Sequence, residues 1–187
     1  GRWRADQFVS PFPMRKLAGC KARRVDGHIA DAAIHYARVW REAGTLTSLD
    51  GGGLRSNTHE LLEFIDVAVV AERLCEQMKL SPGEMLHYLR SRGCKIGAVT
   101  LGAKGMIWYD EAGRDRVIPA LNVPIELVID TNGAGDIFHG AYIYSAITSP
   151  DAAWEEHFRF ARVAAAYAVQ HLGNEACMPT VAQTNET

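Results

Sequence analysis

Short runs of apolar or β-branched residues alternate along this chain with longer amphipathic stretches, and this alternation limits the folds open to it. The runs of strand length lie at 22–26, 45–49, 66–70 and 96–101. Apolar residues at helical spacing follow the first run at 31–43, and Gly44 is a natural stop for that helix. Strand–helix units of this kind join as right-handed crossovers. The chain is therefore predicted to form an α/β fold, a three-layer sandwich with a mainly parallel sheet and helices on both faces.

Local signals place the remaining elements. Ser81-Pro82-Gly83-Glu84 combines a cap, a proline at the first helical position and a first-turn acid, which predicts a helix to Arg92. Asn57 or Thr58 caps a short helix through Phe64. A hairpin is expected from 105–109 and 116–119 around the turn at 110–113, and helices at 134–147 and 154–171. Residues 1–22 have no clear period and are read as a poorly defined N-terminal arm, which leaves 23–187 as a single domain.

The composition of the chain indicates which partners and which kinds of cysteine site are not expected. The 187 residues carry a formal charge of −2, which gives no indication of nucleic acid or an anionic membrane as a partner. No apolar run is long enough to span a bilayer. The four cysteines lie far apart without a CxxC pair, so zinc ligation and a disulfide framework are not expected. Reduced, mostly buried thiols are expected instead, which is typical of a cytoplasmic protein.

The segment from Asp130 to Gly140, DTNGAGDIFHG, holds the chemistry. Its pattern predicts a strand end, a glycine-rich turn and a helix start. Gly133 and Gly135 let the backbone turn tightly and gather N–H groups at a helix N-terminus, where the dipole favours an anion. Asp136 lies in the first helical turn beside these groups. A carboxylate there can accept a proton from a hydroxyl nucleophile while the N–H groups hold a transferring phosphoryl group.

The glycine-rich signals of the chain, here and at Gly97 and Gly102, allow other interpretations. Asp136 could simply complement the helix dipole, and the local pattern leaves that interpretation open. A Walker loop fails because Ala103 and Lys104 follow Gly102 where Lys and Ser/Thr are needed. A dinucleotide fingerprint fails because Phe138 stands at the position of the third glycine, so an NAD-type domain is the weakest alternative.

Three segments in order carry a resemblance to a known family. DTNGAGD resembles the C-terminal signature of the PfkB carbohydrate kinases, usually written DTxGAGD. The segment VTLGAKGMIWYD, from Val99 to Asp110, resembles the family's nucleotide segment, and an alanine-rich helix ending in HLGN follows at the expected place. The resemblance covers roughly Val25 to Pro179. It implies a Rossmann-like, ribokinase-like fold and ATP-dependent phosphorylation of a sugar or related alcohol hydroxyl.

The resemblance also implies roles for individual residues. Asp136 matches the catalytic base, and Gly133, Ala134 and Gly135 match the anion hole. The expected ATP-binding positions are Thr100, Gly102, Gly105, Asn132, Gly173 and Asn174. Asp130 matches a region that binds a monovalent cation such as K⁺ in some members, and Mg²⁺ would accompany the phosphates.

Two features depart from the family pattern. The long N-terminal region with the sugar-binding glycines and a β-sheet lid has no counterpart, so the chain is expected to be either a fragment or a truncated gene product. The acidic magnesium motif NxxE is also missing its Asn, which leaves Glu72 as a loose candidate for Mg²⁺ or a plain N-terminal helical acid. These departures keep a second hypothesis open, a catalytically silent nucleotide-binding or interaction protein. They also predict uncovered apolar surface and hence a homo-oligomer.

Further polar residues follow predicted strands. Asp26 and His28 lie at one strand end, and Arg55 follows the glycine turn that begins at Asp50. A ligand role and a structural role both fit these residues, and the structural role is favoured. His139 could tune Asp136 or pack within its helix. Trp108 and Tyr109 are expected to pack in a strand.

Overall fold

The computed structural model describes residues 19–173 and 175–185. Most of the N-terminal arm predicted for residues 1–22 therefore lies outside the described residues. The chain divides into two compact units, each described here by itself. The first runs to Thr100 and includes Ile107–Arg116, and the second consists of Leu101–Met106 and the chain from Val117 onward.

A six-stranded sheet has its strands in the order of the sequence, from β1 to β6. The strands are β1 (Ala22–Val25), β2 (Leu46–Gly51), β3 (Val67–Ala71), β4 (Ile96–Thr100), β5 (Met106–Tyr109) and β6 (Asp115–Ile118). Neighbours from β1 to β4 are parallel, with Ala22 opposite Leu46 and Val67 opposite Ile96. The predicted α/β class and the mainly parallel sheet are confirmed.

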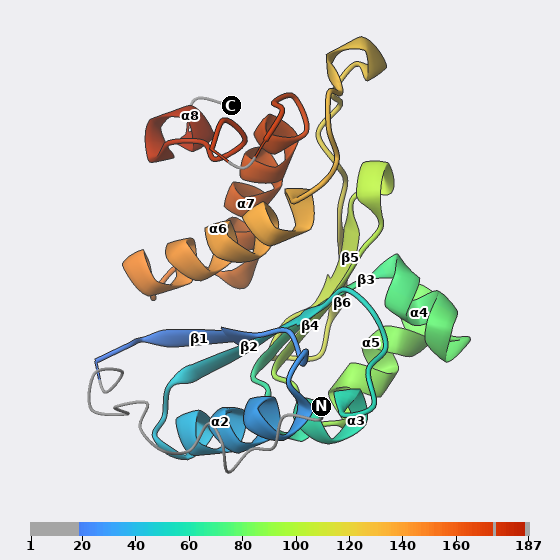
Figure 1. Cartoon of the computed structure of the whole chain (residues 1–187), viewed down its shortest axis with the longest axis vertical. Coiled ribbons are helices and arrows are strands. Elements are labelled where there is room, and N and C mark those ends of the chain that lie inside the picture. Colours follow the sequence, from blue (N-terminus) through green and yellow to red (C-terminus); the bar gives the residue numbers. More distant parts are fainter. Residues whose placement is uncertain (1–18, 174, 186–187) are drawn as a thin grey trace. The chain divides into compact units, whose positions relative to one another are not determined.

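The helices of the first unit connect these parallel strands. They are α2 (Ala30–Glu42), α3 (Thr58–Leu61), α4 (Glu72–Met78) and α5 (Pro82–Ser91), with a 3₁₀ turn, η2, at Leu62–Phe64. Each crossover advances the strand order in the same direction, so right-handed connections place α2 and α5 on one face of the sheet (Figure 1). The predicted box at α5 is present. Ser81 Oγ accepts the backbone N–H of Glu84, and the Glu84 carboxylate accepts that of Ser81.

The centre of the sheet forms the core of the first unit. Val67 to Val70 of β3 and Ile96 to Val99 of β4 are all buried, as expected of the central strands of a parallel sheet. β2 continues two residues beyond its predicted end, because Gly51 has no side chain. A Cβ at Gly51 would lie 2.5 Å from Cγ1 of Val70, so Gly51 serves the packing of adjacent strands and not the turn alone.

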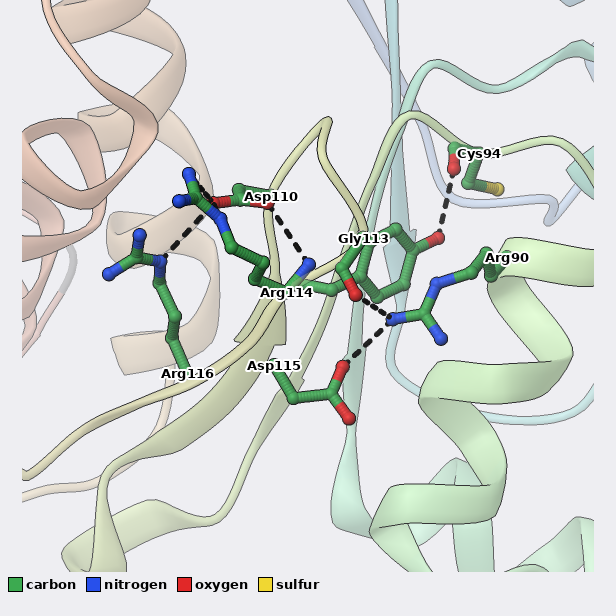
Figure 2. A network of polar contacts seen from close by, with 8 residues as sticks. Arg90, Cys94, Asp110, Gly113, Arg114, Asp115 and Arg116 are labelled. Atoms are coloured by element: carbon green, nitrogen blue, oxygen red, sulfur yellow. Dashed lines mark hydrogen bonds and ion pairs between the residues drawn. The ribbon is translucent and has the colours of Figure 1, made fainter.

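The hairpin of β5 and β6 is anchored to α5 through the turn that joins its strands (Figure 2). Arg90 of α5 donates to the carbonyl of Gly113 over 3.1 Å and to Oδ1 of Asp115 over 2.8 Å. Its guanidinium also lies 4.4 Å from the ring centroid of Tyr109. Trp108 and Tyr109 are buried, which confirms that they pack within a strand. The hairpin and its turn are confirmed.

The second unit is built on two long helices and a short one. They are α6 (Ala134–Thr148), α7 (Trp154–Ala168) and α8 (Val181–Asn185). Phe138 and Tyr142 of α6 pack against Phe158 of α7, with ring centroids 6.1 and 5.6 Å away. α7 ends earlier than the predicted His171, and the N–H of its C-cap, Val169, bonds to the carbonyl of Ala165 over 3.2 Å. Within the described residues, no helix is long and apolar enough to cross a membrane.

Candidate functional site

The turn that precedes α6 takes its shape from one side chain and one glycine. The Asp130 carboxylate accepts the backbone N–H of Asn132 over 2.9 Å, which closes a local turn. Gly133 follows with φ +77°, a left-handed conformation that other residues adopt only under strain. The chain enters the helix at Ala134, and the N–H of Ile137 makes an early helical bond to the carbonyl of Gly133 over 2.9 Å.

This turn places the first backbone amides of α6 in the glycine-rich segment, where the N–H of Ala134 donates to the carbonyl of Thr131 over 3.4 Å. The first N–H groups of any α-helix have no partner within the helix, and here they belong to the glycine-rich segment. A Cβ built at Gly133 or Gly135 would meet no atom within 4 Å. Asp136 lies in the first turn of α6 with its side chain exposed. The structure thus brings the four predicted catalytic positions, 133 to 136, to one helix end that suits an anion, with Gly135 and Asp136 exposed there.

His139, one turn further along α6, is bonded to the backbone of this helix end. It is buried and its Nδ1 donates to the carbonyl of Gly135 over 2.8 Å. Its ring also contacts Tyr142 with centroids 5.5 Å apart. These contacts favour the packing role of His139 over a role in tuning Asp136.

The segment before the turn is not the predicted strand end. A 3₁₀ turn, η4, spans Ile125–Leu127, and the chain then runs extended without pairing in the sheet. The N–H groups of Ile129 and Asp130 both donate to the carbonyl of Val169, over 2.8 and 3.2 Å. The apolar run was wrongly assigned because the end of α7, and not a neighbouring strand, satisfies its backbone.

The predicted nucleotide segment begins at the end of β4. Thr100 is the last residue of that strand, and its hydroxyl donates to the carbonyl of Val70 over 3.4 Å. Gly102 starts a 3₁₀ turn, η3 (Gly102–Lys104), and the N–H of Leu101 bonds to the carbonyl of Gly105 over 2.8 Å. Gly105 has φ +92°, and a Cβ there would lie 2.2 Å from the carbonyl oxygen of Ile118. Only glycine fits at that position, because any side chain would collide with the backbone of the neighbouring strand end.

Asn132 lies in the turn before α6, and the last two predicted ATP-binding positions lie beyond α7. Gly173 has φ +86°, and its carbonyl accepts the N–H of Cys177 over 3.1 Å. Asn174 lies outside the described residues. Thr100 belongs to the first unit, whereas Gly102, Gly105, Gly173 and the turn before α6 belong to the second.

The two residues predicted to bind metal ions, Glu72 and Asp130, belong to different units of the chain. Glu72 is the first residue of α4, which agrees with its interpretation as an N-terminal helical acid. Asp130 holds the turn before α6 through its bond to Asn132. Among residues 19–173 and 175–185, no cluster of three His, Cys, Asp or Glu side chains could hold a metal ion. Mg²⁺ needs no such cluster when nucleotide phosphates and water supply most of its ligands.

The polar residues at the ends of β1 and β2 bind one another. His28 Nδ1 lies 2.8 Å from Oδ2 of Asp26, and Arg55 Nη2 lies 2.6 Å from Nε2 of His28. Burial would raise the pKa of Asp26, but the backbone N–H and the ring of His28 hold it below its ordinary value. Arg24 pairs with Asp50 beside them. These contacts support the structural role that the sequence favoured.

Asn57 is a residue whose role the sequence only partly indicated. It occupies the cap position of α3, as predicted, but its side chain makes no capping bond. The amide group instead donates to the carbonyl of Ala30 over 3.4 Å, and its buried oxygen has no partner among the described residues. A sequence signal for a cap cannot distinguish these two uses of the amide group.

The mostly parallel sheet with its connecting helices defines a class of protein, the α/β domains of the ribokinase-like fold. A family model described as pfkB family carbohydrate kinase matches residues 54–181. The chain belongs to this family. The matched region includes the nucleotide segment and the turn before α6.

Individual relatives agree with this assignment. Ribokinase from Haemophilus influenzae is 27% identical over 160 residues, which cover 80% of this chain and 49% of the relative. Aminoimidazole riboside kinase from Salmonella typhimurium is 31% identical over 75% of this chain and 49% of its own length. The structure of Arabidopsis thaliana ribokinase with ribose and ATP superposes with a TM-score of 0.79 at 26% identity, covering 95% of this chain and 58% of that one. The chain thus spans about half the length of the curated relatives it matches.

Proposed function

We propose that this chain is the nucleotide-binding and catalytic part of an ATP-dependent phosphotransferase that acts on the hydroxyl of a sugar or a related alcohol. The observation that carries the proposal is the glycine-rich turn at the start of α6, where Gly133 and Ala134 are half-buried and Gly135 and Asp136 are exposed in the first helical turn. The names of the relatives, which include ribokinase and aminoimidazole riboside kinase, favour a pentose or a riboside as the acceptor.

Each of these residues has a distinct task in the proposed reaction. The backbone N–H groups of 133–135 hold the negative charge of the transferring phosphoryl group, and the α6 dipole adds to that attraction. The Asp136 carboxylate removes the proton from the acceptor hydroxyl as the new bond forms. ATP, when bound with Mg²⁺, supplies the phosphoryl group.

Other residues of the site would hold the nucleotide and ions. Thr100, Gly102 and Gly105 would line the ATP site, with Asn132, Gly173 and Asn174 completing it. Asp130 would orient the turn and contribute to a monovalent cation such as K⁺. Glu72 is the proposed protein carboxylate near Mg²⁺. We further propose a cytoplasmic location and a homo-oligomeric state.

Replacing Asp136 by Asn tests the proposed base. The amide keeps the size of the side chain but cannot accept the proton, so kcat for sugar phosphorylation should fall by about 10²- to 10⁴-fold. ATP affinity, measured by titration calorimetry, should stay unchanged. Asp151→Asn is the matched control, because Asp151 is also exposed but lies in the loop after α6. Unchanged turnover of the Asp136 variant would refute the role.

A catalytically silent nucleotide-binding protein is the second candidate. The departure from the magnesium motif favours it, because the Asn is missing and Glu72 lies at the start of α4 as an N-terminal helical acid. This candidate predicts that ATP raises the melting temperature of the chain while no sugar in a panel is phosphorylated. Phosphorylation of any sugar by the 187-residue chain would exclude it.

A further inference from the structure

A cavity of about 440 Å³, open to solvent, lies within the second unit at the C-terminal end of α6, and most of its lining residues, Glu156 among them, are exposed. Its size falls in the range of small-molecule sites. The lining residues come from α6, from the connection to α7, from α7 and from α8. They are Tyr144, Ser145, Thr148, Ser149, Ala152, Glu156, Phe160 and Val181. From Asp136 to Tyr144 the helix rises by about 12 Å, so this cavity is separate from the proposed phosphoryl-transfer site.

One part of the cavity wall is aromatic and apolar. The rings of Tyr144 and Phe160 are stacked, with centroids 6.1 Å apart and planes at 27°. Tyr144 remains 43% exposed and Val181 45% exposed, so a ligand could still cover them. Ring faces of this kind attract both alkyl groups and cations.

The charge on the cavity wall has a single sign. Glu156 is its only ionisable acid or base among the lining residues apart from the Tyr144 phenol. Within the part of the chain that the structure describes, Glu156 makes no ion pair, because the neighbouring Arg159 binds Glu155 over 2.7 Å. The remaining polar groups of the wall are the hydroxyls of serine and threonine, which can accept hydrogen bonds from a cation.

A buried histidine behind the cavity adds no positive charge to it. His157 is 2% exposed, and its Nδ1 lies 2.9 Å from Oγ of Ser145. Burial lowers the pKa of His157, although the charge of Glu156 and the carbonyl of Ala152 act in the opposite direction. The ring is therefore neutral at neutral pH and serves to position the Ser145 hydroxyl.

We infer that this cavity binds a small primary ammonium compound with a short apolar body. The ammonium group pairs with the Glu156 carboxylate and donates its other protons to the hydroxyls of the wall. The apolar body lies against Tyr144, Phe160 and Val181. The inference does not depend on the proposed kinase activity, because no residue of the cavity takes part in that reaction.

Titration with n-butylammonium chloride, followed by amide resonances in two-dimensional NMR at pH 7 and constant ionic strength, tests the site. We expect saturable shifts confined to the end of α6, the following connection, α7 near Glu156 and the start of α8. Glu156→Gln should weaken binding by about three- to fivefold, as expected for the loss of an exposed ion pair. n-Butanol has the same apolar body without the charge. It should bind to the unmodified chain no more tightly than butylammonium binds to the Glu156→Gln variant.

A neighbouring glutamate provides the matched control. Glu155→Gln removes the same charge one residue away, but Glu155 pairs with Arg159 and does not line the cavity, so binding should be unaffected. Tyr144→Ala should weaken butylammonium and butanol alike, because it removes the apolar wall. Equal affinity for butanol and butylammonium, equal loss in both glutamate variants, or shifts centred elsewhere would overturn the inference.

Discussion

At the scale of single residues, Gly97 shows how an absent side chain decides the packing around it. A Cβ at Gly97 would lie 2.4 Å from the ring of Tyr109, and the Tyr109 hydroxyl donates to the carbonyl of Cys94 over 2.9 Å. Gly97→Ala should therefore displace a buried ring and lower the free energy of unfolding by about 1–3 kcal/mol. Urea unfolding followed by tryptophan fluorescence measures this change.

Gly83 provides the control for that substitution. It lies in α5, has ordinary helical backbone, and a Cβ there would meet no atom within 4 Å. Gly83→Ala should leave the chain as stable or raise the free energy of unfolding by about 0.5–1 kcal/mol. Equal destabilisation by the two substitutions would show that the Tyr109 contact is not the cause.

The residues of the kinase site and of the cavity differ in how far the sequence can predict them. Gly133 and Asp136 are neighbours along the chain, and the chemistry of a helix start is local, so their sequence predicts their geometry. Glu156 meets Tyr144 and Val181 only because three helices pack together. No spacing within the sequence indicates that meeting, and the cavity was accordingly not predicted.

At the scale of elements, Asp66 lies just before β3 and binds residues at the beginnings of the two neighbouring strands, β2 and β4. Its buried carboxylate accepts the backbone N–H of Thr47 over 3.1 Å and lies 3.1 Å from Nζ of Lys95. Its carbonyl also accepts the N–H of Ile96 over 3.1 Å. Burial raises the pKa of this carboxyl, but the bonds from Thr47 and Lys95 outweigh burial and hold it below its ordinary value.

The pH dependence of stability should report this junction. Because the folded pKa of Asp66 lies below an unfolded value of about 3.9, its stabilisation is present above about pH 4 and is lost as the pH falls through the folded pKa. Asp66→Asn should cost about 1–3 kcal/mol at pH 7, and the difference between variant and unmodified chain should shrink near pH 3. Urea midpoints at both pH values measure it.

Asp115 is a suitable comparison for Asp66. It also pairs with a basic residue, Arg90, but its side chain is 67% exposed. Asp115→Asn should cost less than about 1 kcal/mol. A difference for the Asp66 variant that stayed constant between pH 7 and pH 3 would contradict the proposed junction.

The sequence predicted an element correctly where the signal was local or where the strand was an unbroken apolar run. The capping box at Ser81 and the apolar strands at 67–71 and 96–100 are of this kind. The prediction failed where a distant partner decided the outcome. The sequence around Ile129 is typical of a strand, but the N–H of Ile129 donates to the carbonyl of Val169 at the end of α7. Gly51 reads as a turn residue, but Val70 from the next strand requires a glycine there.

At the scale of the whole molecule, the exposed apolar residues predict self-association. In the second unit Ile125 is 82% exposed, Leu172 71% and Ile129 61%. Contiguous exposed apolar surface marks regions at which proteins associate, and Ile125 and Ile129 lie on the same short segment. We expect the purified chain to be a dimer or larger in multi-angle light scattering. Ile125→Lys should lower its mass, because burying a new charge at an interface is costly.

The neighbouring Glu126 separates the effect of lost apolar surface from that of added charge. Glu126 is exposed, so Glu126→Lys introduces the same side chain without removing an apolar one, and the mass should not change. The far-ultraviolet circular dichroism of both variants should match that of the unmodified chain, which confirms that folding is intact. A monodisperse monomer at all concentrations, or an equal fall in mass for both lysine variants, would contradict an interface at Ile125. Association that depends on Ile125 would identify the 3₁₀ turn before the glycine-rich helix start as part of the contact surface.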